Sequence, residues 1–238
     1  MKTPASYRHV FFDLDGTLTR SRTKITSAMK ETLATLRGSG RDIVIVSGAQ
    51  KSRLDEQADQ FPAVYLAQNG NHAYMIPGEA DLWRDELTEK EKSEIMVHIA
   101  SIPRTWAVKD EKDLIEDRGC QISYSMLGFH EDIGIKEKFD SDFSRRIALL
   151  REHPLVSDTV EVKIAGTTTL DYFRKGMTKG HNVARYIEKN GWKREDCIYV
   201  GDALFPGGND EAVVGVIDTK QVGGPRETTD FIRNIVLE

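Results

Sequence analysis

Short, mostly apolar runs alternate with amphipathic stretches in the first third of the chain. Three such runs predict buried β-strands: 9–12, 42–46 and 64–66. A helix is expected to begin near Thr26, a residue type favoured at helix N-caps, and a second helix is expected over 51–60. This β-α-β-α-β order predicts an α/β fold with a Rossmann-like, doubly wound parallel sheet.

The middle of the chain has a different pattern. Residues 88–91 form a capping box ahead of a helix, and apolar positions around 143–150 mark a second helix. Strands are predicted at 114–116, 121–127, 160–164 and 167–173. We interpret residues 82–171 as an inserted α+β domain, an antiparallel sheet with two helices on one face.

Residues 1–81 and 172–238 then form the core domain on either side of the insertion. The second part of the core has its own alternation of helices and strands. Helices are expected over 179–189 and 226–237, and strands over 198–200 and 213–217. Because the strands of a doubly wound sheet run parallel, their carboxyl ends meet at one edge, where such sheets bind ligands.

The first strand ends in two carboxylates, Asp13 and Asp15, which are followed by Gly16. Side chains alternate along a strand, so both acids reach one site only if the backbone turns, which Gly16 allows. Two acids at the carboxyl end of a parallel strand suit metal-assisted chemistry. A charged turn is the simpler interpretation of an isolated pair, and motifs further along the chain decide against it.

Three further motifs follow in order, two of them at the ends of predicted strands. They are Ser47-Gly48 after 42–46, Lys179 within 176–180, and Gly201-Asp202 with Asn209-Asp210 after 198–200. With residues 11–19, they resemble the four motifs of the haloacid dehalogenase superfamily, which is dominated by phosphotransferases. Each of these three motifs is weak alone, and the ordered set of four is specific.

The resemblance implies a role for each of the core residues. Asp13 would attack phosphorus and carry an aspartyl-phosphate, and Asp15 would be the general acid and base. Ser47 and Gly48 would bind the transferred phosphoryl group, and Lys179 would neutralise its charge. An acid at position 15 favours a phosphatase or a phosphomutase over the ion-pumping ATPases and the dehalogenases of the superfamily.

The same resemblance implies Mg²⁺ as the cofactor. Its expected ligands are Asp13, Asp202 and the backbone carbonyl of Asp15, since hard oxygen ligands suit this ion. Asn209 and Asp210 would orient Lys179 and metal-bound water. Turn formation after the preceding glycines is an alternative role for these last two residues.

Among capped members, the chain most resembles subclass IIB, with a C2B-type cap, and within it the eukaryotic-type phosphomannomutases and related sugar phosphatases. The resemblance rests on residues 15–26, 118–119, 169–171 and 202–210. It implies that Arg22, Arg118, Thr169 and Asp171 contact or face the substrate, and the amide of Gln121 is suited to hydrogen-bond sugar hydroxyls. A solvated loop charge at Arg22 and an ion pair within the cap for Arg118 and Asp171 are the simpler alternatives.

One departure from the mutases concerns the second phosphate site of the cap. The mutase group carries an arginine-bearing Ser-Pro-Ile-Gly-Arg stretch after a cap strand, whereas residues 126–132 of this chain contain two acids and no arginine. Bidentate hydrogen bonding by an arginine guanidinium is the strong way to hold a phosphate dianion. We therefore expect Mg²⁺-dependent hydrolysis of a small phosphorylated metabolite, such as a sugar phosphate. Hexose phosphate mutase activity is the alternative, and a non-catalytic protein that binds a phosphorylated ligand is a third.

Composition and charge narrow the possible partners. The chain has 238 residues, a formal net charge of −5 and two cysteines. It has no long basic run, which argues against nucleic acid as the main partner. It also has no apolar run of transmembrane length. We expect a cytoplasmic enzyme, monomeric or homodimeric, that acts on a small molecule and has no membrane or nucleic-acid partner.

Overall fold

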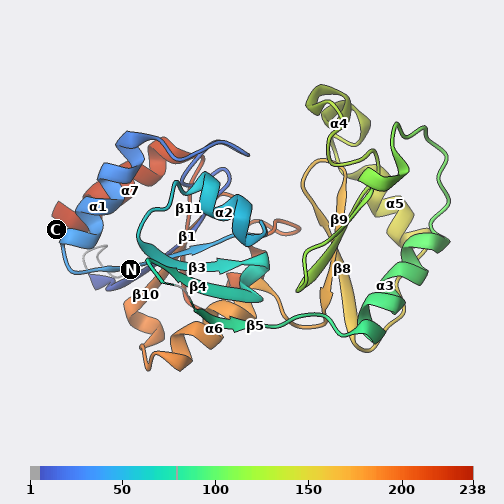
Figure 1. Cartoon of the computed structure of the whole chain (residues 1–238). Coiled ribbons are helices and arrows are strands. Elements are labelled where there is room, and N and C mark those ends of the chain that lie inside the picture. The colour runs from blue at the N-terminus through green and yellow to red at the C-terminus, as the bar shows by residue number, and fades with distance from the viewer. Residues whose placement is uncertain (1–5, 79, 238) are drawn as a thin grey trace. The chain divides into compact units, whose positions relative to one another are not determined.

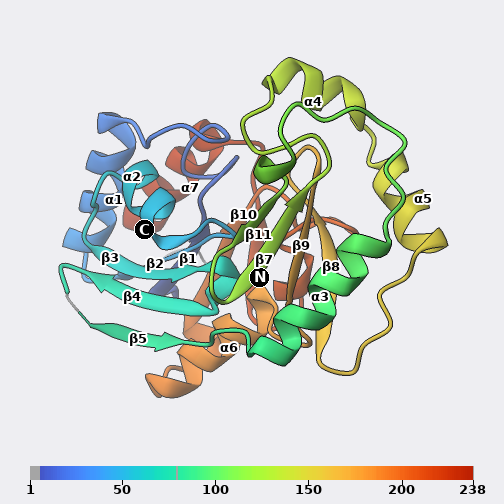
Figure 2. The same ribbon diagram turned by 45° about the vertical axis from the view of Figure 1, so that its right-hand side comes forward.

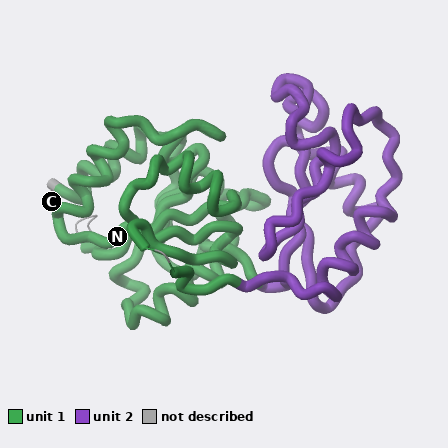
Figure 3. The backbone as a smooth tube through the Cα atoms, viewed as in Figure 1, with its two compact units in different colours: residues 1–84, 177–238 green, residues 85–176 purple. Residues whose placement is uncertain are grey.

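The computed structural model describes residues 6–78 and 80–237. The chain forms two compact units, shown in different colours in Figure 3. Unit 1 combines residues 1–84 with 177–238, and unit 2 consists of residues 85–176. Unit 2 is thus an insertion between two segments of unit 1. No helix among the described residues is long and apolar enough to cross a membrane.

Unit 1 is built on a seven-stranded sheet with the order β11-β10-β1-β2-β3-β4-β5. Neighbouring strands from β11 to β3 run parallel, and β4 and β5 are antiparallel additions at one edge. The strands are β1 (His9–Asp13), β2 (Asp42–Val46), β3 (Ala63–Ala67), β4 (His72–Ile76), β5 (Asp81–Arg84), β10 (Cys197–Gly201) and β11 (Asp218–Gln221).

Helices cover both faces of this sheet (Figures 1 and 2). One face packs against α1 (Ser27–Gly38), α2 (Lys51–Gln57) and α7 (Pro225–Leu237), and the other against α6 (Lys179–Lys189). Side chains alternate along β1, so Val10 and Phe12 join the first layer and Phe11 the second. The central strands are therefore buried on both sides, as parallel strands usually are.

Unit 2 contains a four-stranded antiparallel sheet with the order β6-β7-β9-β8. The strands are β6 (Ile115–Asp117), β7 (Gln121–Ser125), β8 (Val160–Ala165) and β9 (Thr169–Arg174), and the helices are α3 (Glu89–Ser101), α4 (Ile133–Phe139) and α5 (Ser144–Glu152). One face of the sheet carries Ile122, Tyr124, Leu170 and Tyr172, which pack with apolar residues of α3 and α5. The alternate residues of β7 and β9 are mostly polar.

The predicted α/β fold with an inserted α+β domain is confirmed, and several element boundaries differ from those predicted. The strand expected over 213–217 is wrong: Glu211–Val213 forms a short 3-10 helix (η5), and the strand is the exposed, polar β11. The helix expected over 51–60 ends at Gln57, because Asp59 and Gln60 have positive φ. Strands β4 and β5 and helix α4 were not expected.

The boundary placed at residue 171 falls inside β9, which pairs with both β7 and β8 as far as Phe173 and Arg174. The compact unit therefore extends to Gly176 and begins at Asp85. The capping box at the start of α3 is present. Thr88 Oγ1 accepts a hydrogen bond from the Glu91 amide, and the Glu91 carboxylate accepts one from the Thr88 amide.

Glu91 provides a test of how unit 2 is held together. Its carboxylate also pairs with Arg174 of β9, and this contact, with the bonds from Thr88, lowers the Glu91 pKa from 4.5 to about 2. We expect Glu91→Gln to lower the free energy of unfolding at neutral pH by about 1–2 kcal/mol. Because the folded pKa is the lower one, this contribution is complete above about pH 4.5 and is lost as the pH falls toward 2.

Urea unfolding of unit 2 within the full chain, measured from pH 7 down to pH 3, would check this prediction. Glu89→Gln is the matched control, since Glu89 lies in the same helical turn and its side chain is almost fully exposed. A difference between Glu91→Gln and wild type that does not shrink in acid would contradict the assigned pairing.

Candidate active site

Three neighbouring strands of unit 1 bring the predicted motif residues to one edge of the sheet. Strand β1 ends at Asp13, and Asp13 is in register with Val46, the last residue of β2. On the other side, Phe12 is in register with Val200 of β10. Ser47 and Asp202 follow these two strands directly, so the topology places them at the same edge as Asp13.

Lys179 is the first residue of α6 and is buried between two carboxylates. Its Nζ donates to Asp13 Oδ1 at 2.6 Å and to Asp210 Oδ1 at 2.7 Å. All three side chains are almost inaccessible to solvent. Burial alone lowers the pKa of Lys179, but the two carboxylates outweigh that effect and raise it. Lys179 is therefore a fixed cation of the site.

Asp210, which was predicted to orient Lys179 and metal-bound water, also contacts two groups besides Lys179. Besides the Lys179 ammonium, it accepts a hydrogen bond from the Tyr199 hydroxyl at 2.7 Å and one from the Ala203 amide at 3.4 Å. Burial and the Asp210 carboxylate raise the pKa of Tyr199 far above its ordinary value, so Tyr199 stays a donor. Asn209, by contrast, is exposed. Of the two residues predicted to orient Lys179, Asp210 contacts it directly.

The site contains a cluster of carboxylates suited to a divalent cation. Asp13, Asp202 and Asp210 each offer an oxygen within 4.8 Å of the others. Asp13 Oδ2 is buried and has no hydrogen-bond partner among the described residues. Burial raises the pKa of both Asp13 and Asp202, and the Asp210 carboxylate adds to the shift in each case. Hard carboxylate oxygens with excess negative charge fit Mg²⁺.

Gly16 forms the turn that follows Asp13 and Asp15. Its φ is +82°, a region that favours glycine, and its amide donates to the Thr19 carbonyl at 2.8 Å. A Cβ at this position would lie 2.3 Å from Asp202 Oδ2. Gly16 is therefore needed both for the turn and for the close approach of Asp202.

Asp15 is held by donors that the sequence did not identify. Its Oδ1 accepts hydrogen bonds from the Arg22 amide at 2.6 Å and from Gln57 Nε2 at 3.0 Å. Arg22 was predicted to face the substrate through its side chain, and the structure shows that its backbone also positions Asp15. Gln57 lies in the last turn of α2, where nothing in the helical pattern singles it out.

Ser47 and Gly48 occupy the turn after β2. The Ser47 side chain is buried, and its Oγ accepts a hydrogen bond from the Ala49 amide at 3.1 Å. That contact leaves the hydroxyl proton available for a ligand oxygen. A Cβ on Gly48 would meet only the side chain of Asn69, at 3.5 Å. Both residues lie where the sequence predicts a phosphate-binding turn.

The predicted substrate residues of unit 2 lie on β7, on β9 and in the turn before β7. Asp171 Oδ1 accepts a hydrogen bond from Ser123 Oγ at 2.6 Å, and Ser123 Oγ is 3.0 Å from Gln121 Nε2. Burial raises the pKa of Asp171, with Arg118 and these polar neighbours acting against it. Thr169 lies two residues before Asp171 and therefore shares its face of β9.

Arg118 is engaged in an ion pair within unit 2. Its Nε and Nη2 donate to one carboxylate oxygen of Glu116, at 2.9 and 2.6 Å. The alternative considered for Arg118, a pair within this domain, is thus present, with Glu116 as the partner rather than Asp171. Glu116 therefore neutralises the guanidinium charge that Arg118 could otherwise offer to a substrate phosphate.

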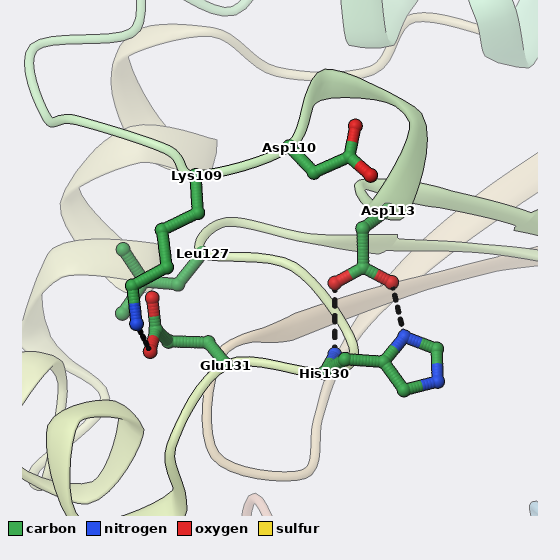
Figure 4. A pocket seen from close by; sticks show the side chains of 6 residues that line it. All are labelled: Lys109, Asp110, Asp113, Leu127, His130 and Glu131. Atoms are coloured by element: carbon green, nitrogen blue, oxygen red, sulfur yellow. Dashed lines mark hydrogen bonds and ion pairs between the residues drawn. The ribbon is translucent and has the colours of Figure 1, made fainter.

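Three residues of the segment 126–132, Leu127, His130 and Glu131, help to line a pocket of about 290 Å³ in unit 2. Figure 4 shows that the basic side chains around this pocket face acids. Lys109 Nζ lies 2.6 Å from Glu131, and His130 Nδ1 lies 2.5 Å from Asp113. Asp110 adds a third carboxylate to the lining. The pocket therefore has no surplus positive charge to offer a phosphate group.

Comparison with known families agrees with this geometry. Residues 10–210 match the model of the haloacid dehalogenase-like hydrolases, which covers most of the chain. The chain belongs to this family. Within it, this haloacid dehalogenase-like enzyme falls in the C2-capped group of phosphomannomutases and sugar phosphatases.

Curated relatives of this haloacid dehalogenase-like enzyme include phosphomannomutases. The phosphomannomutase of Saccharomyces cerevisiae is 28% identical over 244 aligned residues, which cover 96% of this chain and 92% of that protein. Phosphomannomutase 1 of Dictyostelium discoideum is 25% identical, with 94% of each chain covered.

Solved structures show the same fold at lower identity. A haloacid dehalogenase-like hydrolase from Bacteroides thetaiotaomicron has a TM-score of 0.63 at 16% identity and covers 96% of this chain and 99% of its own. The IMP-nucleotidase of Plasmodium falciparum, in an IMP-bound structure, has a TM-score of 0.66 at 12% identity and covers 98% of this chain and 68% of its own.

A pair of glycine substitutions tests the packing of Gly16 against Asp202. Gly40 has nearly the same backbone conformation, with φ of +85°, but no atom lies within 4 Å of its virtual Cβ. We expect Gly40→Ala to cost about 1–2 kcal/mol of stability, from backbone strain alone. Gly16→Ala should cost ~1–3 kcal/mol more, because Asp202 must also move.

Urea denaturation of both variants, followed for unit 1, provides the comparison. Equal losses of stability in the two variants would show that Asp202 does not approach Gly16 as closely as the structure indicates.

Proposed function

We propose that this enzyme hydrolyses the phosphate ester of a small metabolite, and that a sugar phosphate is its substrate. The main support is the buried contact of Lys179 with Asp13 and Asp210, together with an Asp15 carboxylate that accepts hydrogen bonds from two donors. This arrangement pairs a nucleophilic carboxylate with a permanent cation and a separate acid-base group.

The first step transfers the phosphoryl group to Asp13. A carboxylate oxygen of Asp13 bonds to phosphorus while the ester P–O bond breaks, and the Asp15 carboxyl gives its proton to the leaving oxygen. Lys179 offsets the negative charge on Asp13 and on the arriving phosphate, since its ammonium lies 2.6 Å from Asp13 Oδ1. The Ser47 hydroxyl and the turn at Gly48 are positioned to hold phosphoryl oxygens.

The second step removes the phosphoryl group. A water molecule attacks phosphorus, the bond between phosphorus and Asp13 breaks, and the water proton passes to the Asp15 carboxylate. Asp15 thereby regains the proton that it gave away, so the cycle closes without another acid or base.

Mg²⁺ is the proposed cofactor. Asp13 and Asp202, with the Asp15 carbonyl, are the ligands that the sequence predicts, and the structure adds Asp210 to the carboxylates within reach. When bound, the ion would neutralise part of the charge of the phosphate dianion and orient it for attack.

The charge of unit 2 favours transfer of the phosphoryl group to water over transfer to a sugar hydroxyl. A mutase must hold a second phosphate group of a bisphosphorylated sugar. Around residues 126–132, however, Lys109 and His130 are paired with acids, and Arg118 is paired with Glu116. These acids already neutralise the three cations, which weakens the attraction that they can offer to a phosphate dianion.

Phosphomannomutase activity is the second candidate. It is supported by the curated relatives, which are named phosphomannomutases and align over almost the whole chain. The core chemistry is the same in both cases, because either water or a sugar hydroxyl can accept the phosphoryl group from Asp13.

The remaining assignments follow from the sequence. We propose that unit 2 acts as the cap that selects the substrate through Arg118, Gln121, Thr169 and Asp171, and that Arg22 of unit 1 also contacts the substrate. We also propose a cytoplasmic location, which agrees with two buried, free cysteines.

The proposed function predicts phosphate release from hexose phosphates. We expect turnover of at least one of the 1- and 6-phosphates of mannose and glucose, dependent on Mg²⁺ and independent of a hexose bisphosphate activator. Asp13→Asn should lose at least ~1,000-fold in kcat, because a carboxamide is a poor nucleophile, and its circular dichroism spectrum should show that it remains folded.

Release of inorganic phosphate is measured with Mg²⁺ and with chelator, and sugar products are separated by chromatography. Interconversion of the 1- and 6-phosphates with the bisphosphate activator, without phosphate release, would replace hydrolysis by the mutase activity. A kcat of Asp13→Asn equal to that of wild type would overturn the mechanism.

A further inference from the structure

Gln57 is a buried amide at the end of α2 that contacts the acid-base residue of the site. Its side chain is 4% exposed. Gln57 Nε2 donates to Asp15 Oδ1 at 3.0 Å and lies 3.4 Å from the Thr23 carbonyl oxygen. Both partners can only accept, so the orientation of the amide is fixed by them.

The other end of this amide has no partner. Gln57 Oε1 is buried and makes no hydrogen bond with any described residue. A buried carbonyl group without a hydrogen bond lowers the stability of the fold. An apolar side chain at this position would fill the same space without that cost. The position of Gln57 is therefore explained by what Nε2 holds rather than by the stability of the helix.

The second donor to Asp15 comes from a loop whose conformation is itself fixed. Arg22 has φ of +60°, which is uncommon for a residue with a side chain, and this conformation accompanies the 2.6 Å contact of its amide with Asp15 Oδ1. Hydroxyl groups on either side lock the loop. Thr19 Oγ1 contacts Thr23 Oγ1 at 2.8 Å and the Lys24 carbonyl at 2.9 Å.

Gln57 joins this loop to α2 through its backbone as well. Its carbonyl accepts a hydrogen bond from the Ile25 amide at 2.8 Å. One residue thus ties the end of the helix, the loop and the Asp15 carboxylate together. All of these contacts lie within unit 1.

We infer that Gln57 is a positioning residue for proton transfer by Asp15. Gln57 and the Arg22 amide converge on Oδ1, so the proton that Asp15 carries belongs on Oδ2, and the rotation of the carboxyl group is fixed. This inference rests on the proposed function, in which Asp15 protonates the leaving oxygen. It assigns to Gln57 no contact with the substrate and no part in binding it.

A positioning role of this kind has a specific kinetic signature. An alkoxide leaving group needs a proton as the ester bond breaks, whereas 2,4-dinitrophenolate is stable enough to leave without one. The ratio kcat/KM reports the steps up to phosphoryl transfer to Asp13. Loss of a well-placed proton should therefore lower kcat/KM for alkyl esters and leave kcat/KM for the dinitrophenyl ester nearly unchanged.

The test compares the hexose phosphate that the wild-type enzyme hydrolyses fastest with 2,4-dinitrophenyl phosphate. Gln57→Met keeps the side-chain length and removes the donor. We expect this variant to lower kcat/KM for the hexose phosphate ~10–100-fold, because the Asp15 carboxyl group is misplaced. For the dinitrophenyl ester, kcat/KM should change by less than about threefold. Asp15→Ala should show the same selectivity with a larger loss.

Two further variants separate positioning from folding. Gln60→Met is the matched control, because Gln60 is exposed and lies just beyond the helix, and both esters should react as with wild type. Gln57→Glu keeps the shape of the side chain but places a second carboxylate beside Asp15. It should show the same selective loss, and it replaces Gln57→Met if that variant does not fold.

Equal losses for the two esters in the folded Gln57 variants, or no loss for either, would overturn the role of Gln57 and leave the proposed function intact. Failure of the wild-type enzyme to hydrolyse any hexose phosphate in an Asp13-dependent manner would instead overturn the proposed function, and this inference with it.

Discussion

The active site depends on keeping the Lys179 ammonium buried. A cation removed from water is tolerated only when anions and hydrogen bonds replace its hydration, and here Asp13 and Asp210 do so from two separate segments of the chain. Their contact requires close backbone packing around the site. A Cβ on Gly180 would lie 1.8 Å from the Ala212 carbonyl oxygen, and one on Gly201 would lie 2.4 Å from Asp210. Small residues beside the charged ones therefore make the ion pairs possible.

The same ion pairs leave the site with excess negative charge. Asp13, Asp202 and Asp210 face a single lysine, and the raised pKa values of Asp13 and Asp202 reflect burial and mutual repulsion. That repulsion costs stability, and a divalent cation would relieve it. The arrangement that makes Lys179 stable thus also prepares the site for a metal ion. A protein that only needed a stable core would not bury Asp13 Oδ2 where no group in the described part of the chain hydrogen-bonds to it.

Much of this site could be predicted from sequence, because the motif residues follow apolar strands whose parallel order brings their ends together. The contacts that side chains within helices and strands make with the site could not be predicted in this way. Tyr199 lies in an apolar strand and looks like a core residue, yet its hydroxyl binds Asp210. Gln57 reaches Asp15 across 42 positions of the chain. Similarly, the apolar residues at 213–217 suggested a strand, whereas the sheet edge is the polar β11, held by backbone pairing with β10.

The division of labour between the two units follows from where these contacts lie. Asp13, Asp15, Lys179 and the donors that hold Asp15 all belong to unit 1, so the groups proposed to move protons and the phosphoryl group are assembled without any residue of unit 2. Unit 2 has its own packed core and a polar sheet face with Asp171 and Ser123. In the proposed mechanism, attack by water and attack by a sugar hydroxyl make the same demands on unit 1, so unit 2 would decide between hydrolase and mutase activity. The pairing of Lys109, Arg118 and His130 with acids therefore bears on that choice more directly than any feature of Asp13 or Asp15.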